Sequence, residues 1–293
     1  MKFIILFNLV ICLFLSSCQS SIETDLNSGN SIKIESKGMT CKEVQIFVNG
    51  EKRDLEEYQY GDKISLNFIN IEGLKRVGGL AFPGLKLLIT NIKGDTMIFA
   101  EDMYENNGGQ KFDPMTLVAD ITAANPMFSG EKYLAKIDFW DKKGDAKLHA
   151  EFRFSTKANE LIQVKNKKIT HKEVYIFSEK NQQVVSDNAF ENDDKIYFIL
   201  EGIEGFKIQD GLVFPGCMIE VKNKAGEVVL HEDNLLQQYY DNGINYENIR
   251  EKIYFSLNDV ALKSSEELTV HAILIDKLSD AALVLDTKIT LKK

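Results

Sequence analysis

The side chains that could catalyse a reaction or bind a metal are few in this sequence, and they are spread along it. Apart from Cys12 and Cys18 near the N-terminus, the thiols are Cys41 and Cys217, and neither has a histidine beside it that could act as a base. No two histidines stand at a metal-ligand spacing. The sequence therefore predicts neither an enzyme nor a cofactor.

Two acidic pairs, Glu101-Asp102 and Glu232-Asp233, precede loops rich in Asn and Gly. Hard oxygen ligands from such loops are what Ca²⁺ prefers, but neither loop has the alternating Asp-x-Asp spacing of a dedicated site. An acidic residue at the start of a helical turn is equally explained by capping. Calcium binding and capping therefore both stay open as interpretations of these pairs.

Four aromatic residues are the best candidates for a binding surface: Trp140, Tyr104, Tyr239 and Tyr240. Trp140, the only tryptophan, falls on the outward face at the end of a predicted strand, and the tyrosines lie in two equivalent polar loops. Exposed aromatic rings beside polar loops can stack on sugars or anchor a protein interface. For Trp140 the alternative is packing against a second domain or a neighbouring loop.

The chain is organised by a stretch that occurs twice. IEGLKRVGGLAFPG at 71–84 and IEGFKIQDGLVFPG at 203–216 share Ile, Glu, Gly, Lys, Gly, Leu, Phe, Pro and Gly at the same spacing. The copies start 132 residues apart, at positions 71 and 203. This is too long for a solenoid unit of about 20–50 residues and suits a duplicated domain. The shared Phe-Pro-Gly indicates a turn that enters a strand, with a shared binding loop as the alternative.

Length and composition agree with two globular domains. The chain has 293 residues, of which 44% are hydrophobic and 27% charged, and its net charge is -9. Such an acidic chain lacks the clustered Lys and Arg that displace counterions from a phosphate backbone. Nucleic acid is therefore not an expected partner.

Residues 1–17 are typical of a signal peptide. A positive start precedes an apolar run that is too short to span a bilayer, which needs about 20 apolar residues. The run ends in Leu15-Ser16-Ser17-Cys18, which resembles a bacterial lipobox. The resemblance implies that Cys18 is lipidated and becomes the first residue after cleavage. Gln19 in place of Asp favours the outer membrane, and a secretory signal with an incidental Cys18 is the alternative.

Residues 18–37 are rich in Ser, Asn, Thr and acidic residues and poor in large apolar ones. Such a composition buries too little surface to fold. We therefore expect a flexible tether, whose length sets how far the first domain reaches from the membrane.

Residues 38–156 are predicted to form an antiparallel β-sandwich. Alternating apolar residues bounded by turn residues predict strands at 43–48, 63–69, 85–92, 96–100, 115–121, 132–140 and 146–154. One apolar and one polar face per strand suits two sheets that pack face to face with their outer sides wet. Seven short strands at this length resemble an immunoglobulin-like arrangement.

Residues 170–293 repeat this order after a short polar linker at 157–169. KEVYIF at 172–177 repeats KEVQIF at 42–47, and the apolar periodicity continues through diverged letters. The predicted fold class is thus all-β, with two tandem immunoglobulin-like sandwiches related by internal duplication. Cys217 aligns with inward-facing Leu85 and suits a small core residue. A disulfide between Cys217 and Cys41 would require a specific interdomain contact.

The lipid anchor, the duplicated domains and the lack of a catalytic set together favour a non-enzymatic lipoprotein of the cell envelope. Its expected partners are the membrane, through the N-terminal lipid, and another envelope or surface protein, bound through loops or sheet edges. The alternative is a carbohydrate- or calcium-dependent adhesion module. In that case Trp140, the tyrosine loops and the acidic pairs would be its binding groups.

Overall fold

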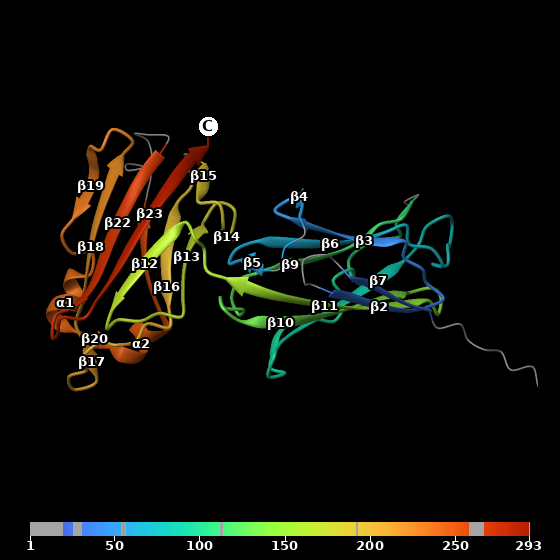
Figure 1. Ribbon diagram of the computed structural model, residues 1–293, viewed down its shortest axis with the longest axis horizontal. Coiled ribbons are helices and arrows are strands. Elements are labelled where there is room, and N and C mark those ends of the chain that lie inside the picture. The colour runs from blue at the N-terminus through green and yellow to red at the C-terminus, as the bar shows by residue number, and fades with distance from the viewer. Residues whose placement is uncertain are drawn as a thin grey trace, which may run out of the picture.

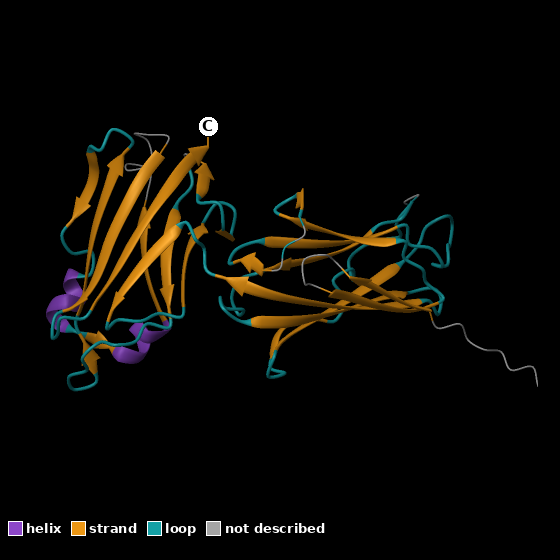
Figure 2. Ribbon diagram, in the orientation of Figure 1, coloured by secondary structure: helices purple, strands orange, loops and turns teal. Residues whose placement is uncertain are grey.

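The computed structural model describes residues 20–25, 31–53, 55, 57–111, 114–191, 193–257 and 267–292. They form two sandwiches of antiparallel sheets, with short helices at one end of the second (Figures 1 and 2). The predicted fold class is confirmed. Within these ranges no helix is both long enough and apolar enough to cross a membrane.

The first sandwich packs a large sheet on a small one. The large sheet contains, in spatial order, β1 (Ser20–Asp25), β2 (Ser31–Lys37), β11 (Lys147–Lys157), β10 (Lys132–Asp141), β7 (Pro83–Asn91) and β8 (Thr96–Ala100), with β5 (Glu57–Gln59) parallel to β11. The small sheet contains β4 (Glu51–Lys52), β3 (Glu43–Val48), β6 (Lys63–Ile69) and β9 (Leu117–Thr122). The chain crosses from one sheet to the other between β6 and β7, between β8 and β9 and between β9 and β10, so each sheet contains strands that are distant in sequence.

The second sandwich repeats this topology strand by strand. Its large sheet contains β12 (Ile162–Lys167), β23 (Ala282–Lys292), β22 (Glu267–Asp276), β18 (Pro215–Asn223) and β19 (Val228–Glu232), with β15 (Ala189–Glu191) parallel to β23. Its small sheet contains β14 (Gln183–Val185), β13 (Glu173–Ser178), β16 (Ile196–Glu201) and β21 (Lys252–Leu257). One end carries the pair β17 (Leu212–Val213) and β20 (Ile244–Asn245), with α1 (Gln237–Asn242) and α2 (Tyr246–Glu251).

Each sandwich has its own core, because every second side chain of its strands points inward. In β10, for example, Tyr133, Ala135, Ile137 and Phe139 are all buried. Cys41 belongs to the first core and Cys217 to the second, and both are free thiols, so they form no disulfide with each other. Burial raises the pKa of Cys41 to about 11 and that of Cys217 to about 12, so neither thiol is a ready nucleophile.

The prediction of a flexible tether over 18–37 is wrong for its C-terminal part. β1 and β2 form a hairpin, and β2 pairs along β11, where Ile32 and Ile34 join the first core. Alternating apolar residues in SIKIES are enough to complete a sheet edge when a neighbouring strand offers its hydrogen bonds. Cys18 lies outside the described residues.

The predicted linker at 157–169 also contains structure. β12 occupies Ile162–Lys167 and pairs with β23 as β2 pairs with β11. The segment that joins the sandwiches is therefore only 158–161. This short connection, and not a flexible hinge, sets the distance between the two domains.

The two sandwiches pack on each other through the outer face of the β13–β16 pair. Tyr60 of the first sandwich is fully buried against Tyr175, with ring centroids 5.2 Å apart, and Ile199 completes the contact. The Asn125 side-chain amide donates to Glu201 at 3.0 Å, and the Ser129 N–H donates to Glu173 at 2.8 Å. Figure 1 shows the end of the first sandwich, near β5 and the end of β11, set against the second.

The interdomain contact includes two carboxylates on directly opposed residues, Glu173 and Glu201, both of which are buried. Burial raises the pKa of Glu173 above its ordinary value, and the neighbouring Glu201 adds to this effect. A raised folded-state pKa means that the contribution of Glu173 to stability is fully present below the unfolded-state pKa. It is lost as pH rises through the folded-state pKa.

Replacement of Glu173 by glutamine should remove this pH dependence. The glutamine keeps an oxygen that can accept from the Ser129 N–H but carries no charge to desolvate. As pH rises above the ordinary pKa of a glutamate, we expect the unfolding temperature of wild type to fall by more than that of E173Q. E43Q, at the equivalent exposed position of the first sandwich, is the control. Equal pH dependence of E173Q and wild type would contradict the prediction.

Candidate binding surfaces

Tyr104, predicted as a surface residue, instead serves the first core. Its hydroxyl donates to the Val118 carbonyl at 2.7 Å and accepts from the Val118 N–H at 2.9 Å. Burial raises the pKa of Tyr104, and its ring lies 6.4 Å from that of Phe139. The prediction that Tyr104 contributes to a binding surface is therefore wrong, because its hydroxyl closes the gap between β9 and the loop after β8.

Trp140 lies on the outer face of the large sheet of the first sandwich, as predicted. Its indole covers Gly84, the directly opposed residue of β7 and the last residue of the repeated Phe-Pro-Gly. A Cβ at Gly84 would stand 2.2 Å from Trp140 Cε2, so only glycine fits beneath the ring. An open groove of about 460 Å³ runs beside Trp140, lined also by Lys37, Lys86 and Lys147.

Replacement of Gly84 by alanine should displace the indole. We expect G84A to lose about 1–3 kcal/mol of unfolding free energy, because the added methyl meets a rigid ring. G216A is the matched control, since its Cβ would lie 3.0 Å from Ile275 and Tyr240, a contact that a much smaller displacement relieves than the 2.2 Å contact at Gly84. Urea unfolding measures the loss of unfolding free energy, and the emission of Trp140 reports the displacement of its indole. An unchanged emission maximum in G84A would contradict the prediction.

Tyr239 and Tyr240 lie at the loop end of the second sandwich, which we define as α1, the 203–214 stretch and the 234–236 turn. Tyr239 is exposed, whereas Tyr240 packs over Gly216 and under Lys277, whose Nζ is 4.6 Å from the ring centroid. Ile208 and Leu235 join this end with half or nearly half of their surface exposed, at 50% and 41%. Figure 2 shows the helices gathered at this end.

The acidic pairs do not have equivalent roles. Asp102 accepts from the N–H groups of Leu85 and Tyr104 and pairs with Lys142 at 2.6 Å. In the second sandwich Asn234 accepts the corresponding N–H bonds, from Cys217 and Leu236. Because the uncharged amide of Asn234 makes the same bonds as the carboxylate of Asp102, this position serves to accept backbone N–H groups. Within the described residues no group of three His, Cys, Asp or Glu side chains could hold a metal ion.

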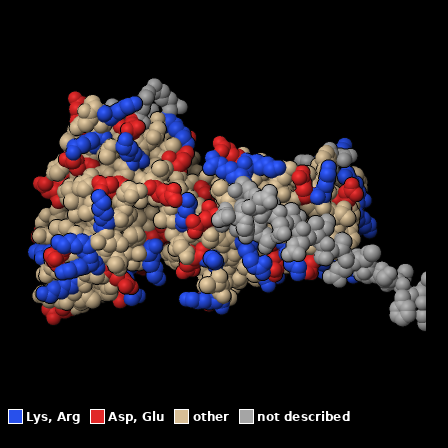
Figure 3. All heavy atoms as spheres, in the orientation of Figure 1, with Lys and Arg blue, Asp and Glu red and all other residues tan. Residues whose placement is uncertain are grey.

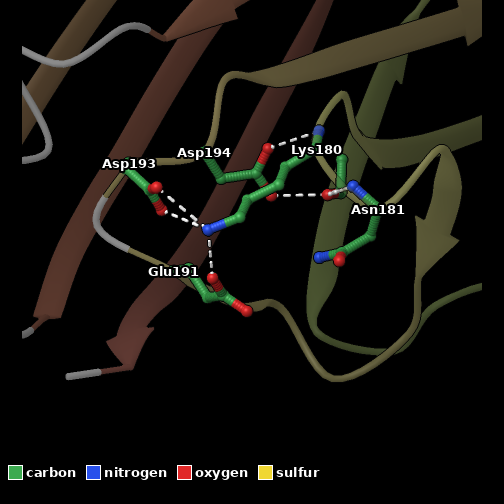
Figure 4. A network of polar contacts seen from close by, with 6 residues as sticks. Lys180, Asn181, Glu191, Asp193 and Asp194 are labelled. Atoms are coloured by element: carbon green, nitrogen blue, oxygen red, sulfur yellow. Dashed lines mark hydrogen bonds and ion pairs between the residues drawn. The ribbon is translucent and has the colours of Figure 1, made fainter.

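The end of the second sandwich that corresponds to the docking end of the first is closed by charged side chains (Figure 4). Lys180 Nζ contacts Asp193 at 2.7 Å and also Glu191, and its backbone N–H donates to buried Asp194. In the first sandwich Asp62 takes the place of Asp194 and accepts from Asn49 at 2.8 Å.

Comparison with known proteins gives no family. No family model matches the chain, and no curated protein matches it. Among solved structures, a DUF3823 family protein from Bacteroides ovatus is 11% identical, with a TM-score of 0.23, over 73% of this chain and 92% of that one. The structure named pT26-6p is 8% identical, with a TM-score of 0.22, over 93% of this chain and 65% of that one. These likenesses are too weak to carry an argument about function.

Several residues of these surfaces were not predicted from the sequence. Lys37 was assigned to the tether, and Ile208 and Leu235 were not singled out among the apolar residues of their loops. The repeat contained one usable signal: KEVQIF becomes KEVYIF, so Gln45 is replaced by Tyr175 at the interdomain contact. A polar outward residue that becomes aromatic in the second copy indicates a face that has gained a partner.

Proposed function

We propose that this chain is a non-enzymatic lipoprotein of the cell envelope that serves as a binding arm for another envelope or surface protein. The binding surface is the loop end of the second sandwich. Cys18 carries the lipid, and the outer membrane is the favoured location because Gln19 follows the cysteine. The interdomain contact holds the two sandwiches as one arm.

The observation that supports this function is that three apolar side chains of this loop end, Ile208, Leu235 and Tyr239, are exposed. Aromatic and aliphatic side chains in exposed loops are typical of the central part of a protein interface. Elsewhere on the face shown in Figure 3, acidic and basic side chains are interspersed. A protein partner therefore finds apolar anchors at the loop end and mixed charge around them.

Crosslinking in the native envelope tests this function with full-length tagged protein. Wild type should capture one protein, and the triple variant I208S/L235S/Y239S should lose it. V228S is the matched control, because Val228 is 51% exposed but lies at the opposite end of the second sandwich. Capture that survives in the triple variant, or no capture by wild type, would overturn the proposal.

A glycan is the second candidate ligand, and exposed Tyr239 beside the stacked pair of Tyr240 and Lys277 is the observation that favours it. Aromatic faces of this kind can stack on sugar rings. Binding of wild type to a glycan array, lost in Y239S alone, would select this alternative. Calcium has less support than a glycan, because the Asp102 carboxylate already accepts backbone donors and pairs with Lys142.

A further inference from the structure

The position at which β1 begins determines which end of the first sandwich lies next to a lipid on Cys18. β1 begins at Ser20, which lies opposite Ser36 of β2, next to Lys37. Two residues of chain span at most about 7 Å. A lipidated Cys18 therefore holds this end of the first sandwich close to the bilayer, because no long tether separates the lipid from the sheet.

A row of residues crosses the outer face of the large sheet at this same end. Lys37 lies opposite Lys147, Lys147 opposite Trp140, and Trp140 opposite Gly84. Both lysines are exposed, and neither forms an ion pair with a described residue. Like charges on directly opposed residues destabilise a sheet unless an anion lies nearby. The row thus offers an aromatic ring and two cations to an anionic surface.

The charge of this end differs from that of the whole chain. This end has eight Lys and Arg residues and six Asp and Glu residues, counted over the described residues of 37–42, 70–82, 101–116 and 141–147. The whole chain, in contrast, has 35 Lys and Arg residues and 44 Asp and Glu residues. Val77, in the loop before β7, is exposed at the same end. The second sandwich has Lys167, Ala282 and Ile275 at the corresponding positions of its row. Only the first sandwich, next to the anchor, carries the tryptophan and the paired lysines.

We propose that the row Lys37–Lys147–Trp140 lies against the membrane surface, with Trp140 among the lipid headgroups and the two lysines at lipid phosphates. This inference rests on the lipid anchor of the proposed function. Tryptophan favours the interface between headgroups and hydrocarbon, and a lysine near an anionic surface is attracted to it. The docking end of the first sandwich is opposite to the row, so the second sandwich is held away from the bilayer (Figure 1).

The emission of Trp140 tests this orientation directly, because Trp140 is the only tryptophan. Full-length lipidated protein is reconstituted into phosphatidylglycerol-containing vesicles with ordinary or brominated lipids. We expect brominated lipid to reduce the emission roughly twofold and vesicle binding to shift it to shorter wavelength. K37E/K147E should show clearly less quenching. K165E/K167E on β12, the strand equivalent to β2, should behave as wild type.

Four results would overturn the inference. The first is that the protein floats with the vesicles but the emission of Trp140 is not quenched. This result would contradict the orientation and leave the proposed binding function intact. The second is equal quenching in K37E/K147E and wild type, which removes the lysines from the contact. The third is emission that responds to an acidic oligosaccharide in solution but not to vesicles. Protein that does not float at all overturns the lipid anchor together with this orientation.

Discussion

Alanine at Gly205 is expected to unfold the second sandwich, and alanine at Gly73 the first. Both glycines follow the Ile-Glu of the repeated stretch and have positive φ, +102° and +93°. A Cβ would lie 2.0 Å from a backbone oxygen in each case, that of Lys168 for Gly205 and that of Gly38 for Gly73. We expect each substitution to cost more than about 4 kcal/mol, because neither the φ angle nor the backbone oxygen can be accommodated.

Urea unfolding followed by circular dichroism measures this effect in the full-length protein. G211A and G79A are the matched controls: both glycines have positive φ, but nothing lies within 4 Å of their Cβ positions. These variants should lose only about 1–2 kcal/mol. Similar midpoints for G205A and G211A would show that the segment between β12 and β13 can move aside, contrary to the prediction.

Exchange of two interdomain residues for their first-sandwich equivalents should separate the domains without unfolding them. Tyr175 and Ile199 are opposed residues on β13 and β16, and the first sandwich has half-buried Gln45 and Asn67 at the corresponding positions. Burial of a large apolar side chain contributes about 1.5–3 kcal/mol, so Y175Q/I199N should weaken the contact by about 3–5 kcal/mol.

Small-angle X-ray scattering and limited proteolysis at 158–161 report this separation. We expect a larger radius of gyration and faster cleavage in Y175Q/I199N, while the strand content stays that of wild type. The reverse exchange Q45Y/N67I, on the equivalent face of the first sandwich, should leave both measurements unchanged. A scattering profile of Y175Q/I199N that matches wild type would mean that the hydrogen bonds of Glu173 and Glu201 suffice to hold the domains.

The sequence by itself determined most of the core strands, the duplication and the faces of these strands. β3, β6 and β8 have the predicted bounds, because alternating apolar residues between turn residues specify a strand and its buried face. It also predicted that Trp140 points outward, because Phe139 beside it points inward. These properties depend on residues close together in the chain, and the period of two is their signal.

Only the tertiary structure decided which outward faces are covered and which segments gain a partner strand. SIKIES resembles a tether in composition but becomes β2 because the edge of β11 is available. Tyr104 resembles Tyr239 in its loop but is held by Val118, 14 residues away and on another strand. The row of Lys37, Lys147 and Trp140 comes from three strands far apart in sequence. Such neighbours arise from strand pairing, which no local pattern encodes.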